Sequence, residues 1–95
     1  MADITPKTIL NKLPDSWEEK DHALHREYTF SSFKMALSFM NECVVSIDLL
    51  NHHPEWSNTY NKIHVILRTH DAGNIVTEKD YALATILEDI YLARF

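Results

Sequence analysis

The apolar positions of this 95-residue chain follow two periods, one typical of strands and one typical of helices. In residues 23–30 the larger side chains fall on every second position and give one apolar-leaning face. The same alternation returns in residues 62–70, which are rich in β-branched side chains. A period of two with this composition predicts β-strands.

A long helix is predicted after the first of these strands. Apolar side chains recur at steps of three and four in residues 32–50, the spacing of one helix face. Ser31 or Ser32 is the expected N-cap. Asn51 is the expected end, because Pro54 cannot continue a helix. The predicted apolar face comprises Phe33, Ala36, Leu37, Met40, Cys43, Val44, Ile47 and Leu50.

Shorter signals predict three further elements. Residues 5–13 predict a helix that ends before a proline, and residues 16–19 predict a short strand. Residues 55–60 and 62–70 predict a β-hairpin whose turn lies among the Ser and Asn residues of 57–61.

The last helix is expected to begin at a capping box. Thr77 is the expected N-cap, and Asp80 completes the box at the third helical position. The face of this helix carries Leu83, Ile86, Leu87, Ile90 and Arg94. The order is α-β-β-α-β-β-α, which predicts an α+β fold with a four-stranded antiparallel sheet and helices packed on one face. We expect residues 1–95 to form a single domain.

Composition narrows the classes of function. The net charge of −5 argues against an electrostatic nucleic-acid or membrane surface. No apolar run is long enough to span a bilayer and no signal peptide is recognisable, so we expect a cytoplasmic protein. The single cysteine, Cys43, lies in the helical pattern and is expected to be a small buried hydrophobe.

Histidines gather where the long helix is expected to stop. His52 and His53 are adjacent there, and His70 ends the second strand of the predicted hairpin. Antiparallel pairing puts the start of one strand beside the end of the other, so we expect the three side chains to meet at one sheet edge. Histidine both gives and takes protons near neutral pH, which indicates proton-transfer chemistry. The alternative is a helix-terminal pair favoured by the macrodipole, with an ordinary strand-end residue.

Two neighbours extend this candidate site. Asp48 precedes His52 by four residues, so on a helix the two share a face. Its carboxylate would orient the imidazole or bind a polar substrate edge, or else form an ordinary helical pair. Trp56 would be either a wall for a flat ring or a core aromatic. A zinc site on three histidines is the main rival, although adjacent histidines point their rings apart.

The remaining histidines are expected to lie elsewhere. His64 shares strand parity with His70, but six strand residues span about 20 Å. His22 and His25 lie near the first predicted hairpin and are interpreted as surface or packing residues.

The spacing of the candidate residues resembles that of the pterin-4a-carbinolamine dehydratases. The matching positions are Asp48, His52-His53-Pro54, Tyr60, His70 and Asp80. The resemblance runs from about Trp17 to the C-terminus and includes the Tyr60-Asn61-Lys62 turn and the helix start at Thr77. It departs at Asp48, where several relatives carry Glu, at Asn51, where Asp is frequent, and in the slightly longer loop of residues 71–76.

This resemblance implies a lyase that removes water from 4a-hydroxytetrahydropterin and gives quinonoid dihydropterin. Such an enzyme needs no metal or cofactor and recycles the pterin of aromatic amino acid hydroxylases. On this basis we expect His52 and His70 to be the acid and base groups. We expect His53 to bind and orient the pterin, with Asp48 orienting His52. Trp56 would line the cavity, and Asp80 would support the site.

The resemblance also implies a homodimer or homotetramer built on residues 32–50. Two other functions stay open. Animal members of the family act as dimerisation cofactors for a homeodomain transcription factor, which would make this chain a binding module. A metal-dependent hydrolase that uses the three histidines is the other alternative.

Overall fold

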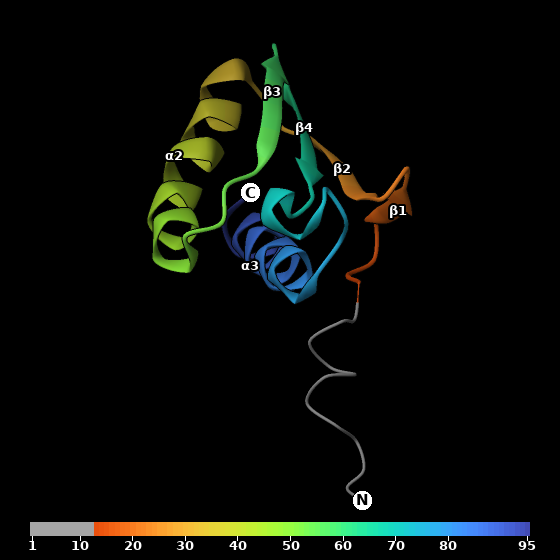
Figure 1. Cartoon of the computed structure of the whole chain (residues 1–95). Coiled ribbons are helices and arrows are strands. Elements are labelled where there is room, and N and C mark those ends of the chain that lie inside the picture. Colours follow the sequence, from red (N-terminus) through yellow and green to blue (C-terminus); the bar gives the residue numbers. More distant parts are fainter. Residues whose placement is uncertain (1–12) are drawn as a thin grey trace, which may run out of the picture.

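A computed structural model of the chain describes residues 13–95. The elements are β1 (Glu18–Lys20), β2 (Ala23–Thr29), α2 (Phe33–Leu50), β3 (Glu55–Thr59), β4 (Lys62–Leu67), the short 3-10 helix η1 (His70–Ala72) and α3 (Glu78–Arg94). Figure 1 shows their arrangement. A helix was expected at residues 5–13. All of that range except residue 13 lies outside the residues that the structure describes.

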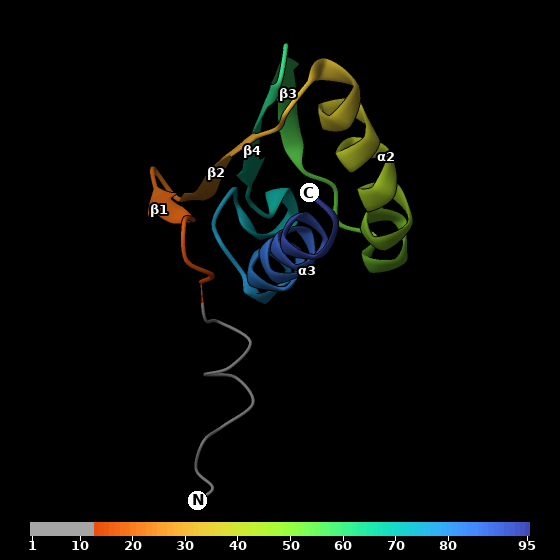
Figure 2. The same cartoon turned by 180° about the vertical axis from the view of Figure 1, so that it is seen from behind.

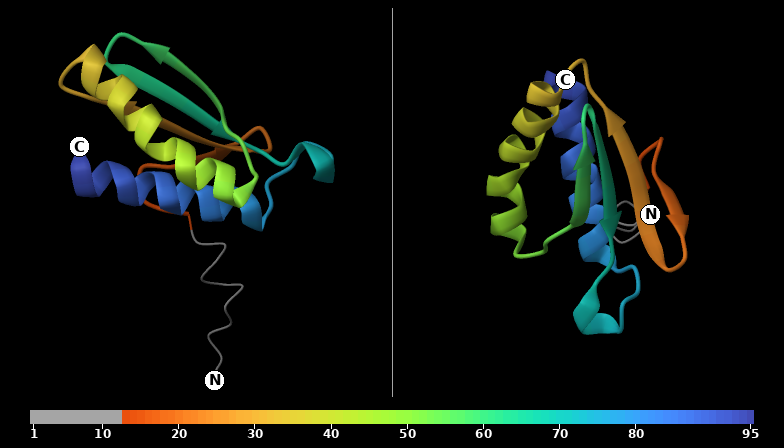
Figure 3. Two further views of the ribbon diagram at one scale, coloured as in Figure 1. Left: turned by 90° about the vertical axis from the view of Figure 1, so that its left-hand side faces the viewer. Right: turned by 90° about the horizontal axis from the view of Figure 1, so that it is seen from above.

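The predicted α+β fold is confirmed. Four antiparallel strands form one sheet in the order β1-β2-β4-β3. Both α2 and α3 lie on the same side of this sheet, as the two views of Figure 3 show. The edge strand β1 and the helix α2 lie at opposite sides of the molecule in Figure 1 and in the reverse view of Figure 2. The short strand expected at residues 16–19 begins later, at Glu18.

Buried and more exposed side chains alternate along β2 and β4, so the sheet has one buried face and one open face. Leu24 and Tyr28 of β2 are fully buried, as are Ile63 and Val65 of β4. The residues between them point to the opposite face, because successive strand side chains alternate. The core therefore lies between the sheet and the two helices, and no described helix covers the other face.

The N-cap of α2 is Ser32, whose side chain accepts a hydrogen bond from the backbone N–H of Met35. The buried stripe of the helix is narrower than predicted. It comprises Ala36, Phe39, Cys43 and Ile47. Phe33, Leu37, Val44 and Leu50, expected in the core, are exposed, as are Val45 and Leu49. The helix carries apolar residues on more of its circumference than the sheet and α3 cover.

Cys43 is buried, as predicted. Burial raises the pKa of its thiol to about 12, with a smaller contribution from the charge of Glu42. Among residues 13–95, no helix has both the length and the apolar character needed to cross a membrane.

A buried carboxylate on α3 holds the helix to the sheet. Glu88 accepts hydrogen bonds from the Trp17 indole at 2.9 Å and the Tyr28 hydroxyl at 3.0 Å. Arg26 adds two bonds, at 3.0 and 3.1 Å. Burial alone would raise the pKa of Glu88, but the bonds from Arg26 and Tyr28 outweigh it and hold the pKa below its usual value. Burial, with the nearby Glu88 charge, raises the pKa of Tyr28.

Candidate active site

The end of α2 decides where the two adjacent histidines point. Asn51 adopts a left-handed conformation (φ 53°, ψ 41°), and its backbone N–H bonds back to Asp48 and Ile47. Such a residue turns the chain away from the helix axis. His52 consequently turns inward and is only 8 % exposed, whereas His53 is exposed.

The buried His52 meets a carboxylate from α3. Its Nε2 lies 2.6 Å from Oδ1 of Asp80, which is fully buried. A carboxylate only accepts, so Nε2 of His52 carries the proton and donates. No other described residue hydrogen-bonds to this ring, so Nδ1 is the nitrogen left for a substrate.

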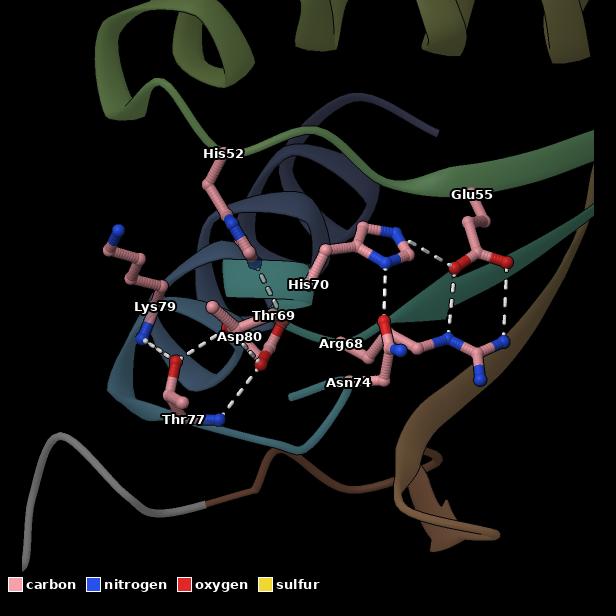
Figure 4. A network of polar contacts seen from close by, with 9 residues as sticks. All are labelled: His52, Glu55, Arg68, Thr69, His70, Asn74, Thr77, Lys79 and Asp80. Atoms are coloured by element: carbon pink, nitrogen blue, oxygen red, sulfur yellow. Dashed lines mark hydrogen bonds and ion pairs between the residues drawn. The ribbon is translucent and has the colours of Figure 1, made fainter. Parts of the chain in front are cut away.

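The second carboxylate oxygen of Asp80 is also fully used. Oδ2 accepts from the Thr69 hydroxyl at 2.8 Å and from the backbone N–H of Thr77 at 2.8 Å. The second bond belongs to the predicted capping box, which is confirmed. The two threonine hydroxyls lie 2.6 Å apart. Figure 4 shows this network joining the end of β4, the start of α3 and His52.

His70 lies in a tight turn and not at a strand end. β4 stops at Leu67, Thr69 bridges to Ile75, and His70 begins η1. The His70 ring sits between two oxygen acceptors (Figure 4). Its Nδ1 is 2.5 Å from Oδ1 of Asn74, and its Nε2 is 3.5 Å from Oε2 of Glu55.

Although His70 lies beyond the end of β4, the three histidines line one open hollow of about 190 Å³. Its other lining residues are Asn51, Arg68, Thr69, Asp71 and Lys79. A second hollow of about 210 Å³ shares His52 and Lys79 and has mainly apolar walls. A further hollow, of about 530 Å³, shares Thr69, Asp71 and Lys79 with the histidine hollow, but no histidine lines it.

Two expected neighbours lie elsewhere. The Asp48 carboxylate contacts His53, at 3.3 Å, and not His52, because the turn at Asn51 removes His52 from the helix face. Trp56 does not line the histidine hollow. It pairs with the buried Val65 and packs against the core, because its strand parity points it toward the helices.

Metal chemistry was the rival interpretation of the three histidines. Within residues 13–95, no three His, Cys, Asp or Glu side chains gather in a geometry that would hold a metal ion. His52 has its Nε2 committed to Asp80, and His70 has its Nδ1 committed to Asn74.

Sequence reasoning missed several residues of the site. Arg68 and Lys79 bring positive charge to the hollow, and Arg68 also forms two bonds to Glu55, at 2.9 and 3.2 Å. Thr69 and Arg68 directly precede His70, which was the one available signal. Lys79 and Asn74 reach the site only through the fold of η1 and α3.

Comparison with known proteins identifies the family. Residues 2–90 match the family described as pterin 4 alpha carbinolamine dehydratase. A relative from Opitutus terrae, named provisionally for that activity, is 47% identical over 89 residues, covering 94% of this chain and 89% of its own. One from Thermomicrobium roseum is 39% identical over 90 residues and covers 95% of each.

A solved structure agrees. The Brucella melitensis protein described as a transcriptional coactivator/pterin dehydratase superposes with a TM-score of 0.77 and 38% identity, covering 81% of this chain and 83% of that one. The chain therefore belongs to the pterin-4a-carbinolamine dehydratase family and has the dehydratase activity of that family.

Proposed function

We propose that the hollow lined by His52, His53 and His70 is where this chain dehydrates its pterin carbinolamine. The observation that supports it most is the pair of imidazoles held by fixed oxygen partners at one hollow: His52 by Asp80, and His70 by Asn74 and Glu55. The bond to Asp80 leaves Nδ1 of His52 for proton transfer, and the longer contact to Glu55, at 3.5 Å, leaves Nε2 as the less tightly held nitrogen of His70.

The reaction needs one acid and one base. The C4a–O bond of 4a-hydroxytetrahydropterin breaks, and its oxygen leaves as water after taking a proton. The electron pair of N5 forms the new C=N bond as the N5 proton is lost. The base gains one proton and the acid loses one, so the pair keeps its total number of protons, and proton exchange with solvent then returns each group to its starting state. The nitrogen supplies the driving electron pair, and positioned acid–base groups accelerate such steps by roughly 10²–10⁴-fold.

His52 suits the role of base. Asp80 accepts from Nε2, so Nδ1 keeps its lone pair for the N5 proton. The buried carboxylate also stabilises the imidazolium that forms when the proton arrives. Because Asp80 is fixed by Thr69 and Thr77, the ring orientation is set before the substrate binds.

His70 suits the role of acid. One of its ring nitrogens faces the Asn74 amide oxygen and the other faces the Glu55 carboxylate. Two oxygen acceptors can hold an imidazolium with a proton on each nitrogen, ready to protonate the departing hydroxyl. Arg68 bonds to the same Glu55 carboxylate and so limits its movement.

His53 and the second, apolar hollow bind the pterin. His53 is exposed at the rim and is steadied by Asp48, at 3.3 Å. The second, apolar hollow meets the first at His52 and Lys79, and offers space for a flat bicyclic ring. Asp48 thereby acts through His53, and Trp56 contributes packing of β3.

The test follows the decay of pre-formed 4a-hydroxytetrahydropterin by its ultraviolet absorbance. We expect His52→Gln and His70→Gln to slow the catalysed decay by about 10²-fold or more, and His53→Gln mainly to raise KM. The matched control is His22→Gln, which alters an exposed histidine outside the hollow. Full activity in both His52→Gln and His70→Gln would refute the roles. Loss of activity on chelation would favour the metal-dependent alternative.

We also propose that α2 mediates self-association into a homodimer or homotetramer. Its exposed apolar side chains are Phe33, Leu37, Val44, Val45, Leu49 and Leu50. A domain of this size commonly adds stability by burying such a surface against another copy. The coactivator role in the name of the Brucella structure keeps a binding function as the second candidate for the same surface.

A further inference from the structure

Two histidines outside the catalytic hollow meet on the open face of the sheet. His25 lies on β2 and His64 on β4. Both alternate with buried residues of their strands, so both point away from the helices. They occupy diagonal positions, since His25 pairs with Ile66 and His64 with Glu27. The catalytic hollow does not include either ring.

The two rings face each other through nitrogen atoms. Nδ1 of His25 lies 3.4 Å from Nε2 of His64, with ring centroids 5.6 Å apart. This separation is long for a hydrogen bond, which favours about 2.7–3.2 Å. A strong direct bond between the two imidazoles therefore does not account for their approach.

A backbone carbonyl fixes the tautomer of His25. Its Nε2 is 3.2 Å from the carbonyl oxygen of Lys20. A carbonyl oxygen only accepts, so Nε2 carries the proton and Nδ1 presents a lone pair toward His64. Metal-binding histidines commonly donate their second ring N–H to a backbone carbonyl in this way.

We propose that His25 and His64 form a binding site for a divalent transition-metal ion, with Zn²⁺ as its simplest occupant. Two imidazole nitrogens at about 2.0–2.1 Å from a tetrahedral zinc ion are about 3.3–3.4 Å apart. The observed 3.4 Å matches this spacing without movement of either strand. On binding, His64 carries its proton on Nδ1 and gives its Nε2 lone pair to the metal.

Two carboxylates lie close to the pair of histidines. His25 and His64 line a hollow of about 250 Å³ together with Glu18 and Glu27. Glu18 is the cross-strand partner of His25, and Glu27 is that of His64. Neither carboxylate completes a group of three ligands within residues 13–95, so water or a rotated glutamate fills the remaining positions.

Nearby positive charge weakens the site without blocking it. Lys62 is 3.9 Å from Glu27 on the same face, and Lys20 and Arg26 line the hollow. The guanidinium of Arg26 is bound to Glu88 on the core side. Imidazole ligands suit Zn²⁺, Ni²⁺ and Cu²⁺, whereas Mg²⁺ prefers oxygen ligands. The site should therefore bind any of the three transition-metal ions more tightly than Mg²⁺.

The ion would join the two central strands of the sheet. β2 and β4 form the longest described pairing, and the Lys20 carbonyl adds the end of β1. An ion that binds only the folded state raises the unfolding temperature as its concentration exceeds Kd. The site would therefore act on stability, and it does not depend on the catalytic assignments.

The experiment compares Zn²⁺ with Mg²⁺ by thermal unfolding and by titration calorimetry on the full chain. We expect Zn²⁺ to raise the unfolding temperature of the unaltered protein and Mg²⁺ to leave it unchanged. His25→Ala and His64→Ala should each weaken Zn²⁺ binding at least about tenfold. His22→Ala is the control, because that exposed histidine lies outside β2 and β4 and is not one of the two facing rings.

Zinc bound at His52, His53 or His70 would be a separate event, and the double variant His25→Ala/His64→Ala isolates it. Undiminished Zn²⁺ affinity in the double variant would overturn the proposal. So would the absence of any Zn²⁺-induced shift in the unaltered protein. As a second readout, the ring nitrogen resonances of His25 and His64 should move together on Zn²⁺ addition in nuclear magnetic resonance spectra. Movement confined to the other histidines would count against the site.

Discussion

The carboxylate of Asp80 lies 2.6 Å from Nε2 of His52, although the two residues are 28 positions apart in the chain. One oxygen of the carboxylate holds the imidazole, and the other closes the capping box of α3 at Thr77. The group that starts the last helix therefore also orients a proposed catalytic ring. Stability of this helix start and the position of His52 are coupled through one side chain.

Asp80→Asn should lower kcat with a smaller effect on KM. The amide presents one acceptor and one donor group, so it cannot accept from both His52 and Thr77 as the carboxylate does. We expect a loss of about 10²-fold, the lower end of what one acid–base group supplies. The measurement is the decay of pre-formed carbinolamine over a range of pH. A His52 ring that is no longer held by the carboxylate should change the pH dependence of kcat as well as its value.

The matched control for this variant is Thr77→Ala. It removes the N-cap side chain, which costs about 1 kcal/mol of stability, and leaves Asp80 in contact with His52. Its rate should stay near that of the unaltered protein. An equal loss of rate in both variants would mean that Asp80 acts through the helix start alone.

Asn74 should affect the rate because it holds a proton on Nδ1 of His70. Its side chain accepts from Nδ1 of His70, and its backbone is left-handed (φ 62°), a conformation that Asn and Gly tolerate. Asn74→Gly keeps this backbone and removes the acceptor, so we expect kcat to fall by about tenfold. Asn74→Asp keeps an acceptor at the same place and should retain most of the rate. Steady-state kinetics on both variants make the comparison, and equal rates in the two would contradict it.

Local signals in the sequence were enough for much of the fold. The Ser32 and Thr77 caps, the turn before Lys62 and the stop near Pro54 each depend on residues adjacent in the chain. Because the hairpin was predicted, His70 could be placed beside His52 and His53.

Long-range partners could not be predicted in the same way. Asp48 was expected to contact His52 because the two are four residues apart, but the left-handed Asn51 ends the helix between them. Glu88 looks like an exposed helix residue in the sequence, and its partners Trp17 and Tyr28 are 71 and 60 residues away. No periodic pattern in the sequence predicts either contact.

Val45→Asp should dissociate the oligomer and so lower the mass of the particle in solution. Val45 is 66% exposed on α2, among the apolar side chains proposed for self-association. A buried, unpaired carboxylate would oppose association by several kcal/mol. Light scattering after size exclusion gives the mass directly. Leu92→Asp on α3 is the control, because Leu92 is comparably exposed, at 71%, but lies outside α2. Unchanged mass in Val45→Asp, or a monomeric unaltered protein, would refute the α2 interface.

Glu88→Gln should destabilise the fold at neutral pH and do so less in acid. The variant leaves the guanidinium of Arg26, whose side chain is 13% exposed, without its charged partner, which costs about 3 kcal/mol. In the folded state, the bonds from Arg26, Tyr28 and Trp17 overcome the opposing effect of burial and hold the pKa of Glu88 below its usual value. The contribution of its charge is therefore fully present above the usual glutamate pKa of about 4.3. It is lost as the pH falls through the lowered folded pKa.

Urea unfolding at a series of pH values from neutral to about pH 3 separates this effect from general acid denaturation. The difference in unfolding free energy between the unaltered protein and Glu88→Gln should be largest at neutral pH and shrink below about pH 4.3. Asp89→Asn is the matched control, since its neighbouring carboxylate is exposed and should change stability by less than about 0.5 kcal/mol. A difference that stays constant with pH would show that Glu88 acts by packing and neutral hydrogen bonds. A shrinking difference places the stabilisation in the charged bond between α3 and the sheet.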